Sequence, residues 1–280
     1  MAKFTTLQVG GPADFFVRVE TVSELREAFQ FAQDKSLPTF MLGGGSNLLF
    51  ADAGFRGLVI RNEIGQVEFA GNLLKAGSGI SLAALVMESA RRGLAGLENF
   101  AGIPGSVGAA VCGNASGIGE KIAQVKILEG EAEKIIPQKD LTFAYRDSNL
   151  RGQIITELEF ELKETDEDLS KKVSDLAREK ALKQPFEKTA GSWFKNPSLA
   201  KTSEGESSQM KAWELIEQAG CRDLRAGDAV ISERHANFFQ NSGSARAADF
   251  LALEKIVSAK VEKKFGVKLK REVVVVESGG

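Results

Sequence analysis

The chain contains 280 residues, with 36 Lys and Arg against 38 Asp and Glu, so its formal net charge is −2. This balance gives no basic excess of the kind that draws a protein to nucleic acid or to an anionic membrane, and we expect neither as a partner. A small molecule is the ligand that the composition favours. The length is sufficient for two domains, since single hydrophobic cores seldom grow much beyond this size.

The sequence lacks the signals of export and membrane insertion. It does not begin with a charged segment followed by an apolar one, and no run approaches the roughly 18 apolar residues of a membrane span. The 2 cysteines, Cys112 and Cys221, form neither a CxxC motif nor a metal-ligand spacing. We therefore expect a soluble cytoplasmic protein with reduced, structural thiols and no metal site.

The first half of the chain alternates short apolar segments with glycine-rich turns. Thr21 and Glu24 form a T-x-x-E capping box at the start of the amphipathic segment 22–35, which predicts a helix there. A second helix is expected over residues 81–93. Strands are expected at residues 14–19, 38–42, 57–62, 66–71, 73–78 and 152–163.

The pattern changes at a charged stretch, KETDEDLSKK, that begins at Lys163. Beyond it the apolar spacing becomes helical, with Leu169, Val173 and Leu176 on one face. We therefore predict a first domain over residues 1–163, built of two α+β lobes, and a smaller α+β domain over residues 164–280. Later helices are expected at 211–220 and 247–265, strands at 236–241 and 271–276, and an exposed loop at 202–209. The fold class is α+β.

A glycine-rich segment, LGGGSNLLF, follows the predicted strand 38–42. Adjacent glycines allow positive φ and let backbone N–H groups approach an anion closely, which suits a pyrophosphate. The segment matches neither GxGxxG nor the P-loop pattern, so a plain flexible turn is an equal alternative for it alone. Its candidate ligand-binding residues are Gly43, Gly44, Gly45, Ser46 and Asn47.

A second glycine-rich segment, GLENFAGIPGSVGAAVCGNASG, occupies residues 96–117. Long glycine-rich loops inside a compact domain usually carry function. Two such loops in one domain fit a long dinucleotide laid across it, and the alternative is a pair of tight turns near a sheet edge. The candidate residues in this loop are Gly102, Ile103, Pro104, Gly105, Ser106, Gly108 and Ala109.

The motifs, taken in order, resemble those of the UDP-N-acetylenolpyruvoylglucosamine reductase family. They are FTTLQVGGPADFFV, LGGGSNLLF, GLENFAGIPGSVGAAV, YRDSNL, AGSWFKNP, WELIEQAG, SERHANFFQN and KKFGVKLKREVVVV, and they cover almost the whole chain. The resemblance implies a non-covalently bound FAD in a domain of the vanillyl-alcohol-oxidase type, and a C-terminal domain for the substrate. It also implies that NADPH reduces the enolpyruvyl ether of a UDP-sugar, which yields UDP-N-acetylmuramate for peptidoglycan.

The resemblance also assigns roles to three candidate catalytic residues. Ser192 lies in AGSWFKNP and matches the serine that donates a proton to the carbanionic carbon in this family. A proton donor of this kind does not need a histidine as a base, and the chain's one histidine is His235. Arg146 in YRDSN would stabilise charge on the enolpyruvyl carboxylate, and Glu272 matches a glutamate that assists the same intermediate. Read without the resemblance, Ser192 could equally be a turn residue, Arg146 a surface ion-pair residue and Glu272 an edge charge.

Four further residues are candidates for binding the UDP-sugar. Lys183 and Asn196 match positions that contact the diphosphate, whereas Tyr145 could equally be a core residue and His235 a structural one. The chain departs from the family at Arg271, where proline is common, and at VCGNASGIG in the second loop. It also lacks the tyrosine-bearing insertion that one subtype carries before Ser192, so it resembles the shorter subtype.

Two other functions remain compatible with parts of the sequence. A flavin-dependent oxidase of alcohols or sugars would use the same glycine loops but would leave YRDS and GSWFKNP without a function. A sugar-nucleotide or dinucleotide sensor could keep the fold without turnover. We expect the enzyme to act as a monomer.

Overall fold

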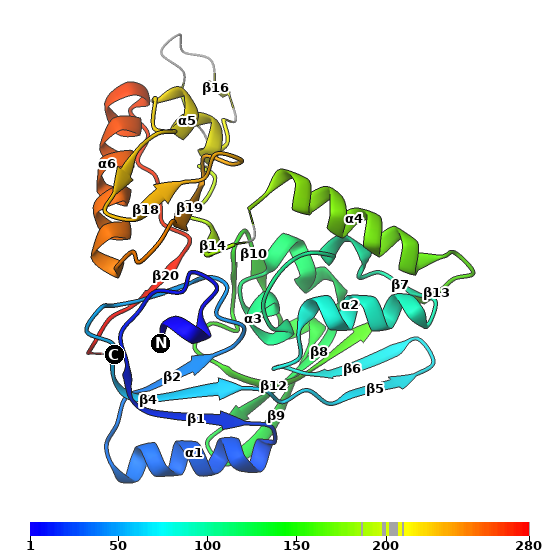
Figure 1. The fold of residues 1–280 in the computed structure, drawn as a ribbon. Coiled ribbons are helices and arrows are strands. Elements are labelled where there is room, and N and C mark those ends of the chain that lie inside the picture. The colour runs from blue at the N-terminus through cyan, green and yellow to red at the C-terminus, as the bar shows by residue number, and fades with distance from the viewer. Residues whose placement is uncertain (186, 198–199, 202–206, 209, 280) are drawn as a thin grey trace. The chain divides into compact units, whose positions relative to one another are not determined.

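The computed structural model describes residues 1–185, 187–197, 200–201, 207–208 and 210–279 (Figure 1). It forms two compact units, each of which is discontinuous in sequence. Unit 1 contains Met1–Asp14, Gly45–Arg56 and Ala181–Gly280, and unit 2 contains Phe15–Gly44 and Gly57–Lys180. The helices are α1 (Val22–Asp34), α2 (Leu82–Arg91), α3 (Val107–Cys112), α4 (Leu169–Lys183), α5 (Ala212–Gln218) and α6 (Ala247–Phe265).

Unit 2 is built around an antiparallel sheet. Its strand order is β5 (Val67–Ala70), β6 (Leu73–Gly77), β12 (Ile154–Glu161), β8 (Ile122–Glu129) and β9 (Ala132–Pro137). Helices α2, α3 and α4 gather on one side of this sheet (Figure 1). Their buried residues Leu85, Val107 and Val173 share one apolar core with Leu158 of β12, which fixes the helices on the sheet.

A smaller sheet in unit 2 carries the first helix. Its order is β1 (Ala13–Val19), β4 (Phe55–Asn62) and β2 (Thr39–Leu42), with β2 parallel to β4. Helix α1 packs on it through Leu25, which is buried with Val19 and Ile60. The predicted capping box is present: the Thr21 side chain accepts from the backbone N–H of Glu24, and the Glu24 carboxylate accepts from that of Thr21.

Unit 1 contains a four-stranded antiparallel sheet in the order β14 (Thr189–Ser192), β19 (Phe238–Asn241), β18 (Ala229–Ile231) and β17 (Arg225–Ala226). Helices α5 and α6 pack against it. The indole of Trp193 is fully buried between the rings of Phe239 and Phe250, at centroid distances of 4.6 and 5.4 Å. This aromatic stack ties the end of β14 to both β19 and α6.

The remaining strands form two-stranded ladders. Strand β20 (Val274–Val276) runs parallel to β3 (Leu48–Phe50), and the other pairs are antiparallel. These are β7 (Leu94–Ala95) with β13 (Lys163–Glu164), β10 (Phe143–Ala144) with β11 (Asp147–Ser148), and β15 (Ala200–Lys201) with β16 (Ser207–Ser208).

The predicted α+β fold is confirmed, and the helix predicted over 247–265 has those bounds. The loop predicted over 202–209 lies mostly outside the described residues, since only Ser207–Ser208 of it are described. The domain boundary near Lys163 stays a prediction, although residues 169–180 of α4 pack with unit 2. No helix within the described residues has the length and apolar character needed to cross a membrane.

Candidate active site

The two predicted glycine loops meet in unit 2, backbone against backbone. A Cβ atom on Gly44 would lie 2.5 Å from the Cα of Gly105, and one on Gly43 would lie 2.4 Å from the Oγ of Ser106. Real Cβ atoms do not approach backbone atoms this closely, so position 44 requires glycine. The loops therefore form one structure, which the sequence predicted only as two separate segments.

A third backbone segment completes this arrangement. The loop after β6 accepts hydrogen bonds from the second glycine loop: Val107 N–H donates to the Ile80 carbonyl at 2.9 Å, and Gly108 N–H donates to the Ser78 carbonyl at 2.9 Å. A Cβ on Gly108 would lie 2.7 Å from the Cβ of Ser78. Sequence analysis missed this segment, although two glycines flanking Ser78 directly after a strand were a usable signal.

We call the backbone of residues 43–44, 78–80 and 105–108 the glycine cradle. Gly43, Gly44, Gly79, Gly105 and Gly108 have no side chains, so the backbone itself lines this surface. Backbone N–H groups on such a surface can approach a pyrophosphate closely. The N–H groups of residues 78–80, 107 and 108 donate within the protein, so those of Gly43, Gly44, Gly105 and Ser106 are the ones that would serve the diphosphate of FAD. Ile103 is partly buried against the main core, while Pro104 and Ala109 are exposed on the same loop.

Helix α4 and Glu98 hold the second glycine loop from outside. The ammonium of Lys180 donates to the Ala101 carbonyl at 2.8 Å, and that of Lys172 lies 3.4 Å from the Glu98 carboxylate, which also accepts from Gly96 N–H at 2.6 Å. Burial raises the pKa of the Glu98 carboxyl, but the backbone N–H groups and Lys172 outweigh it, so the pKa lies below its usual value. Burial lowers the pKa of Lys180.

Arg146 lies in a short hairpin that is fixed to the end of the second glycine loop. Strands β10 and β11 pair Ala144 with Asp147, so Arg146 occupies the turn, with a φ of +56°. The Asn114 amide donates to the Ala144 carbonyl at 2.9 Å, and the Ser148 hydroxyl donates to the Cys112 carbonyl at 2.7 Å. Unit 2 therefore brings the YRDS motif to the VCGN segment of the same loop.

Tyr145 occupies the same turn as Arg146. Tyr145 is 58% exposed, which excludes the core role that sequence analysis kept open. The guanidinium of Arg146 lies 5.9 Å from its ring centroid, at the outer limit of a cation–π contact. Both residues belong to unit 2, whereas Ser192 and Glu272 belong to unit 1.

Unit 1 brings the other two predicted catalytic residues, Ser192 and Glu272, onto neighbouring backbone segments. The N–H of Glu272 donates to the Trp193 carbonyl at 2.8 Å, and the N–H of Lys195 donates to the Lys270 carbonyl at 2.8 Å. This antiparallel pairing sets Glu272 opposite the residue that follows Ser192. Ser192 is partly exposed and ends β14, so its hydroxyl is not part of the core.

The end of the first glycine loop lies next to Glu272 in the same unit. The Asn47 amide donates to the Glu272 carbonyl at 3.2 Å, and Val274 N–H donates to the Asn47 carbonyl at 3.0 Å. Gly45 has a φ of +67°, and a Cβ there would lie 2.1 Å from the Phe4 carbonyl oxygen. Ser46, between them, is partly exposed. Asn47 thus has a structural contact to the Glu272 segment in addition to its predicted flavin role.

The three predicted substrate residues of unit 1 lie in different settings. Lys183 is exposed at the last position of α4. The Asn196 amide oxygen accepts from Ala212 N–H at 3.0 Å, which places Asn196 at the start of α5. The His235 Nδ1 accepts from Asn237 N–H at 3.3 Å, and the ring packs edge-on to Phe238 at 4.7 Å. Burial lowers the pKa of His235, which favours its neutral form at pH 7.

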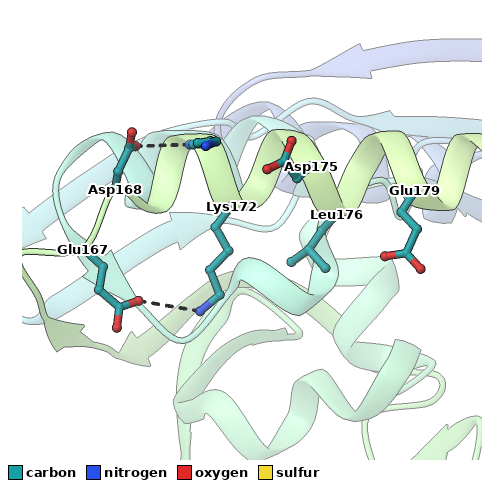
Figure 2. A pocket seen from close by; sticks show the side chains of 7 residues that line it. Glu167, Asp168, Lys172, Asp175, Leu176 and Glu179 are labelled. Atoms are coloured by element: carbon teal, nitrogen blue, oxygen red, sulfur yellow. Dashed lines mark hydrogen bonds and ion pairs between the residues drawn. The ribbon is translucent and has the colours of Figure 1, made fainter.

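A hollow beside α4 contains none of the predicted site residues (Figure 2). Lys172 and Glu167 form an ion pair of 3.9 Å there, and Lys171 N–H donates to the Asp168 carboxylate at 3.1 Å. This is a charged, solvated helix face rather than a ligand site. Within the described part of the chain, no three His, Cys, Asp or Glu side chains are grouped so that they could hold a metal ion.

Comparisons with known proteins agree with this geometry. An FAD binding domain matches residues 13–128, and the C-terminal domain of UDP-N-acetylenolpyruvoylglucosamine reductase matches residues 183–276. UDP-N-acetylenolpyruvoylglucosamine reductase 2 of Symbiobacterium thermophilum is 38% identical over 98% of this chain and 90% of its own length. The reductase of Carboxydothermus hydrogenoformans is 38% identical over 98% of this chain and 91% of its own.

A solved structure matches over the same extent. The crystal structure of UDP-N-acetylenolpyruvylglucosamine reductase from Thermus caldophilus superposes with a TM-score of 0.81 at 36% identity, and the match covers 98% of this chain and 96% of that one. These matches confirm the resemblance that the motifs indicated. The chain therefore belongs to the UDP-N-acetylenolpyruvoylglucosamine reductase family, with an FAD-binding domain at residues 13–128.

Proposed function

We infer that this chain catalyses the NADPH-dependent reduction of UDP-N-acetylglucosamine-enolpyruvate to UDP-N-acetylmuramate, a precursor of peptidoglycan. The relatives support the reaction, since they match over nearly the whole chain and carry the name of this activity. The structural observation that carries the inference is the hydrogen-bonded pairing of the Ser192 and Glu272 segments in unit 1. The matches above give no support to an oxidase or a sensor.

The glycine cradle and its neighbours would hold the cofactor. FAD, when bound, accepts hydride from NADPH and supplies it to the substrate. Gly43, Gly44, Gly105 and Ser106 would offer backbone N–H groups to its diphosphate, and the glycines of the 102–109 segment add little side-chain bulk there. Gly45, Ser46 and Asn47 continue the same loop into unit 1.

Ser192 would donate the proton that completes the reduction. Addition of hydride to one carbon of the enolpyruvyl double bond leaves negative charge at the other, which bears the carboxylate. A hydroxyl is a weak acid in water, but one positioned at the developing carbanion can transfer its proton. Glu272, on the paired segment, would assist the same intermediate.

Arg146 would stabilise the charge that develops on the substrate carboxylate. A guanidinium offers planar paired donors that match a carboxylate, and its charge is permanent. The hairpin turn of Arg146 is anchored through both flanking strands, so backbone structure holds the residue in place. Fixed donors of this kind act on the transition state without reorganisation.

The UDP-sugar would be bound by Lys183 and Asn196 at its diphosphate, with Tyr145 and His235 at its periphery. Lys183 is exposed and supplies a point charge. We further propose that the protein works in the cytoplasm and that it is a monomer. Sedimentation of the holoenzyme can test the monomeric state.

An anaerobic titration of the purified holoenzyme tests the reaction. NADPH is expected to bleach the flavin absorbance, and the enolpyruvyl UDP-sugar is expected to restore it with formation of UDP-N-acetylmuramate. UDP-N-acetylglucosamine, which lacks the enolpyruvyl group, should leave the flavin reduced. Re-oxidation by oxygen alone, after reduction by alcohols or sugars and not by NADPH, would favour an oxidase, and protein that binds no flavin would favour a sensor.

A further inference from the structure

One carboxylate oxygen in unit 1 holds both segments that carry the proposed proton-transfer residues. The Oε2 atom of Glu254 accepts the indole N–H of Trp193 at 3.0 Å. The same oxygen accepts the guanidinium Nε–H of Arg271 at 2.7 Å. Trp193 directly follows Ser192, and Arg271 directly precedes Glu272.

Glu254 belongs to α6, which packs along these segments through its apolar face. Phe250, one turn earlier on α6, stacks on the Trp193 ring at 5.4 Å, so the indole is fixed on its face and at its N–H by the same helix. The Glu254 side chain is only 16% exposed. A partly buried carboxylate that accepts two donors, one of them charged, is a strong and directional anchor.

The backbone at Trp193 and Phe194 is fixed as well. The Asn237 side chain accepts from Phe194 N–H at 2.9 Å and donates to the Phe194 carbonyl at 2.8 Å, and Trp193 N–H donates to the Asn237 carbonyl at 2.7 Å. Asn237 therefore sets the main chain after Ser192. Glu254 joins this segment to the Arg271 segment through side chains.

We propose that Glu254 is a positioning residue that sets the distance between the Ser192 hydroxyl and the Glu272 carboxylate. The inference rests on the proposed function, because it concerns the geometry of the proposed proton donor and its partner. Glu254 also explains how a cation, Arg271, can stand directly before the proposed catalytic carboxylate of Glu272. The Glu254 carboxylate engages the Arg271 guanidinium and keeps it from turning to Glu272 as a competing partner.

Replacing the Glu254 carboxylate with a neutral amide should therefore slow protonation of the substrate more than it destabilises the fold. Glu254→Gln keeps an oxygen that can accept the Trp193 N–H but no longer balances Arg271. A misplacement of about 1 Å in a reacting group can slow a reaction roughly a hundredfold, so we expect re-oxidation by the enolpyruvyl UDP-sugar to slow by about tenfold to a hundredfold. Flavin content and the rate of flavin reduction by NADPH should stay at the wild-type level.

The matched control is Glu262→Gln on the same helix. Glu262 is exposed and forms an ion pair of 3.6 Å with Lys268, whereas Trp193 and Arg271 both donate to Glu254. This variant carries the same chemical change and is expected to re-oxidise at the wild-type rate. Arg271→Lys, which keeps a cation for Glu254, should recover most of the rate that Arg271→Met loses.

Stopped-flow measurement of both half-reactions in H₂O and D₂O decides the matter. The proposal expects a larger solvent isotope effect on re-oxidation in Glu254→Gln, since proton transfer then limits the rate, and an unchanged one in Glu262→Gln. Equal slowing of both half-reactions, or an isotope effect like that of the control, would assign Glu254 to structure alone. Trp193→Phe, which keeps an aromatic ring in the stack but loses the N–H and part of the indole volume, provides the same comparison if Glu254→Gln does not fold. Failure of the wild-type enzyme to be re-oxidised by the UDP-sugar would instead overturn the proposed function.

Discussion

The glycine cradle and the paired segments of Ser192 and Glu272 are built in opposite ways. The cradle is made by the absence of side chains: its backbone runs come so close that a Cβ on Gly44 would lie 2.5 Å from the Cα of Gly105. The paired segments are joined by backbone hydrogen bonds and are held in place by polar side chains: Glu254 accepts from the side chains of Trp193 and Arg271, and Asn237 accepts from the Phe194 N–H. The first design suits a large, chemically competent cofactor, and the second suits a proton that must travel between defined atoms.

The difference predicts how each region fails. A substitution in the cradle changes volume, so it should reduce flavin binding and leave the chemistry of any bound flavin intact. A substitution in the paired segments changes hydrogen bonding, so it should keep the flavin and lose rate. A cradle substitution that lowers the rate without loss of flavin, or a substitution in the paired segments that loses the flavin, would contradict this difference between the two regions.

The largest effect is expected at Ser192. Ser192→Ala should lower kcat by about 10²–10⁴-fold with normal flavin content and normal affinity for the UDP-sugar, because general acid catalysis is worth this much and the lost atom acts in the transition state. Ser192→Cys, which keeps an acidic hydrogen, should recover part of the rate. Steady-state kinetics of the two variants check this, and wild-type turnover in both would leave Ser192 with only a structural role.

Arg146 should come next. Removing one stabilising donor for a developing anion costs about 10²–10³-fold in kcat, so Arg146→Ala should lose this much in the step that uses the UDP-sugar. Arg146→Lys keeps the charge without the paired donors and should fall between wild type and Ala. The rate of flavin reduction by NADPH serves as the internal reference, and a loss confined to that step would contradict the role.

Substitution of Gly44 is expected to lower the flavin content of the protein, whereas substitution of a glycine outside the cradle is not. Gly44→Val forces bulk into a backbone contact, and overpacking costs about 1–3 kcal/mol, equivalent to roughly a tenfold to hundredfold weaker FAD. Gly65→Val is the matched control, because a Cβ on Gly65 meets its nearest atom at an ordinary 3.4 Å. The ratio of flavin to protein absorbance after purification measures both, and full flavin in Gly44→Val would remove the cradle from the FAD site.

The smallest effect is expected where α4 supports the second glycine loop. Lys180→Met keeps the apolar stem and loses the bond to the Ala101 carbonyl, which should weaken FAD by about threefold to tenfold, since such bonds contribute about 0.5–1.5 kcal/mol. Lys171→Met, an exposed lysine on the same helix, should bind FAD like the wild type. Quenching of flavin fluorescence on titration into apoprotein measures the affinity, and equal values would show that α4 does not support the loop.

The sequence predicted most elements of the fold, because local signals define them. The capping box of Thr21 and Glu24 and the apolar stripe over 247–265 need only neighbours along the chain. Both glycine loops were also visible as composition. The pairing of the loops was not, since it depends on contacts between Gly44 and Gly105, and the two glycines that flank Ser78 were a usable signal that sequence analysis missed.

The catalytic residues were predicted for a different reason. Ser192, Arg146 and Glu272 came from the resemblance of their motifs, and each had an ordinary structural reading without it. Glu254 was missed, because a glutamate on a long amphipathic helix reads as a surface charge. Only the structure places its carboxylate against Trp193 and Arg271, residues that are distant from it in sequence.

The most direct test of the division between the two regions is stopped-flow analysis of both half-reactions in Ser192→Ala, with the flavin absorbance followed throughout. The account predicts that NADPH reduces the bound flavin at the wild-type rate and that re-oxidation by the enolpyruvyl UDP-sugar slows by about 10²–10⁴-fold. Near-normal re-oxidation, or equal slowing of both half-reactions, would contradict it and would move the proton donor to Glu272 or to a bound water.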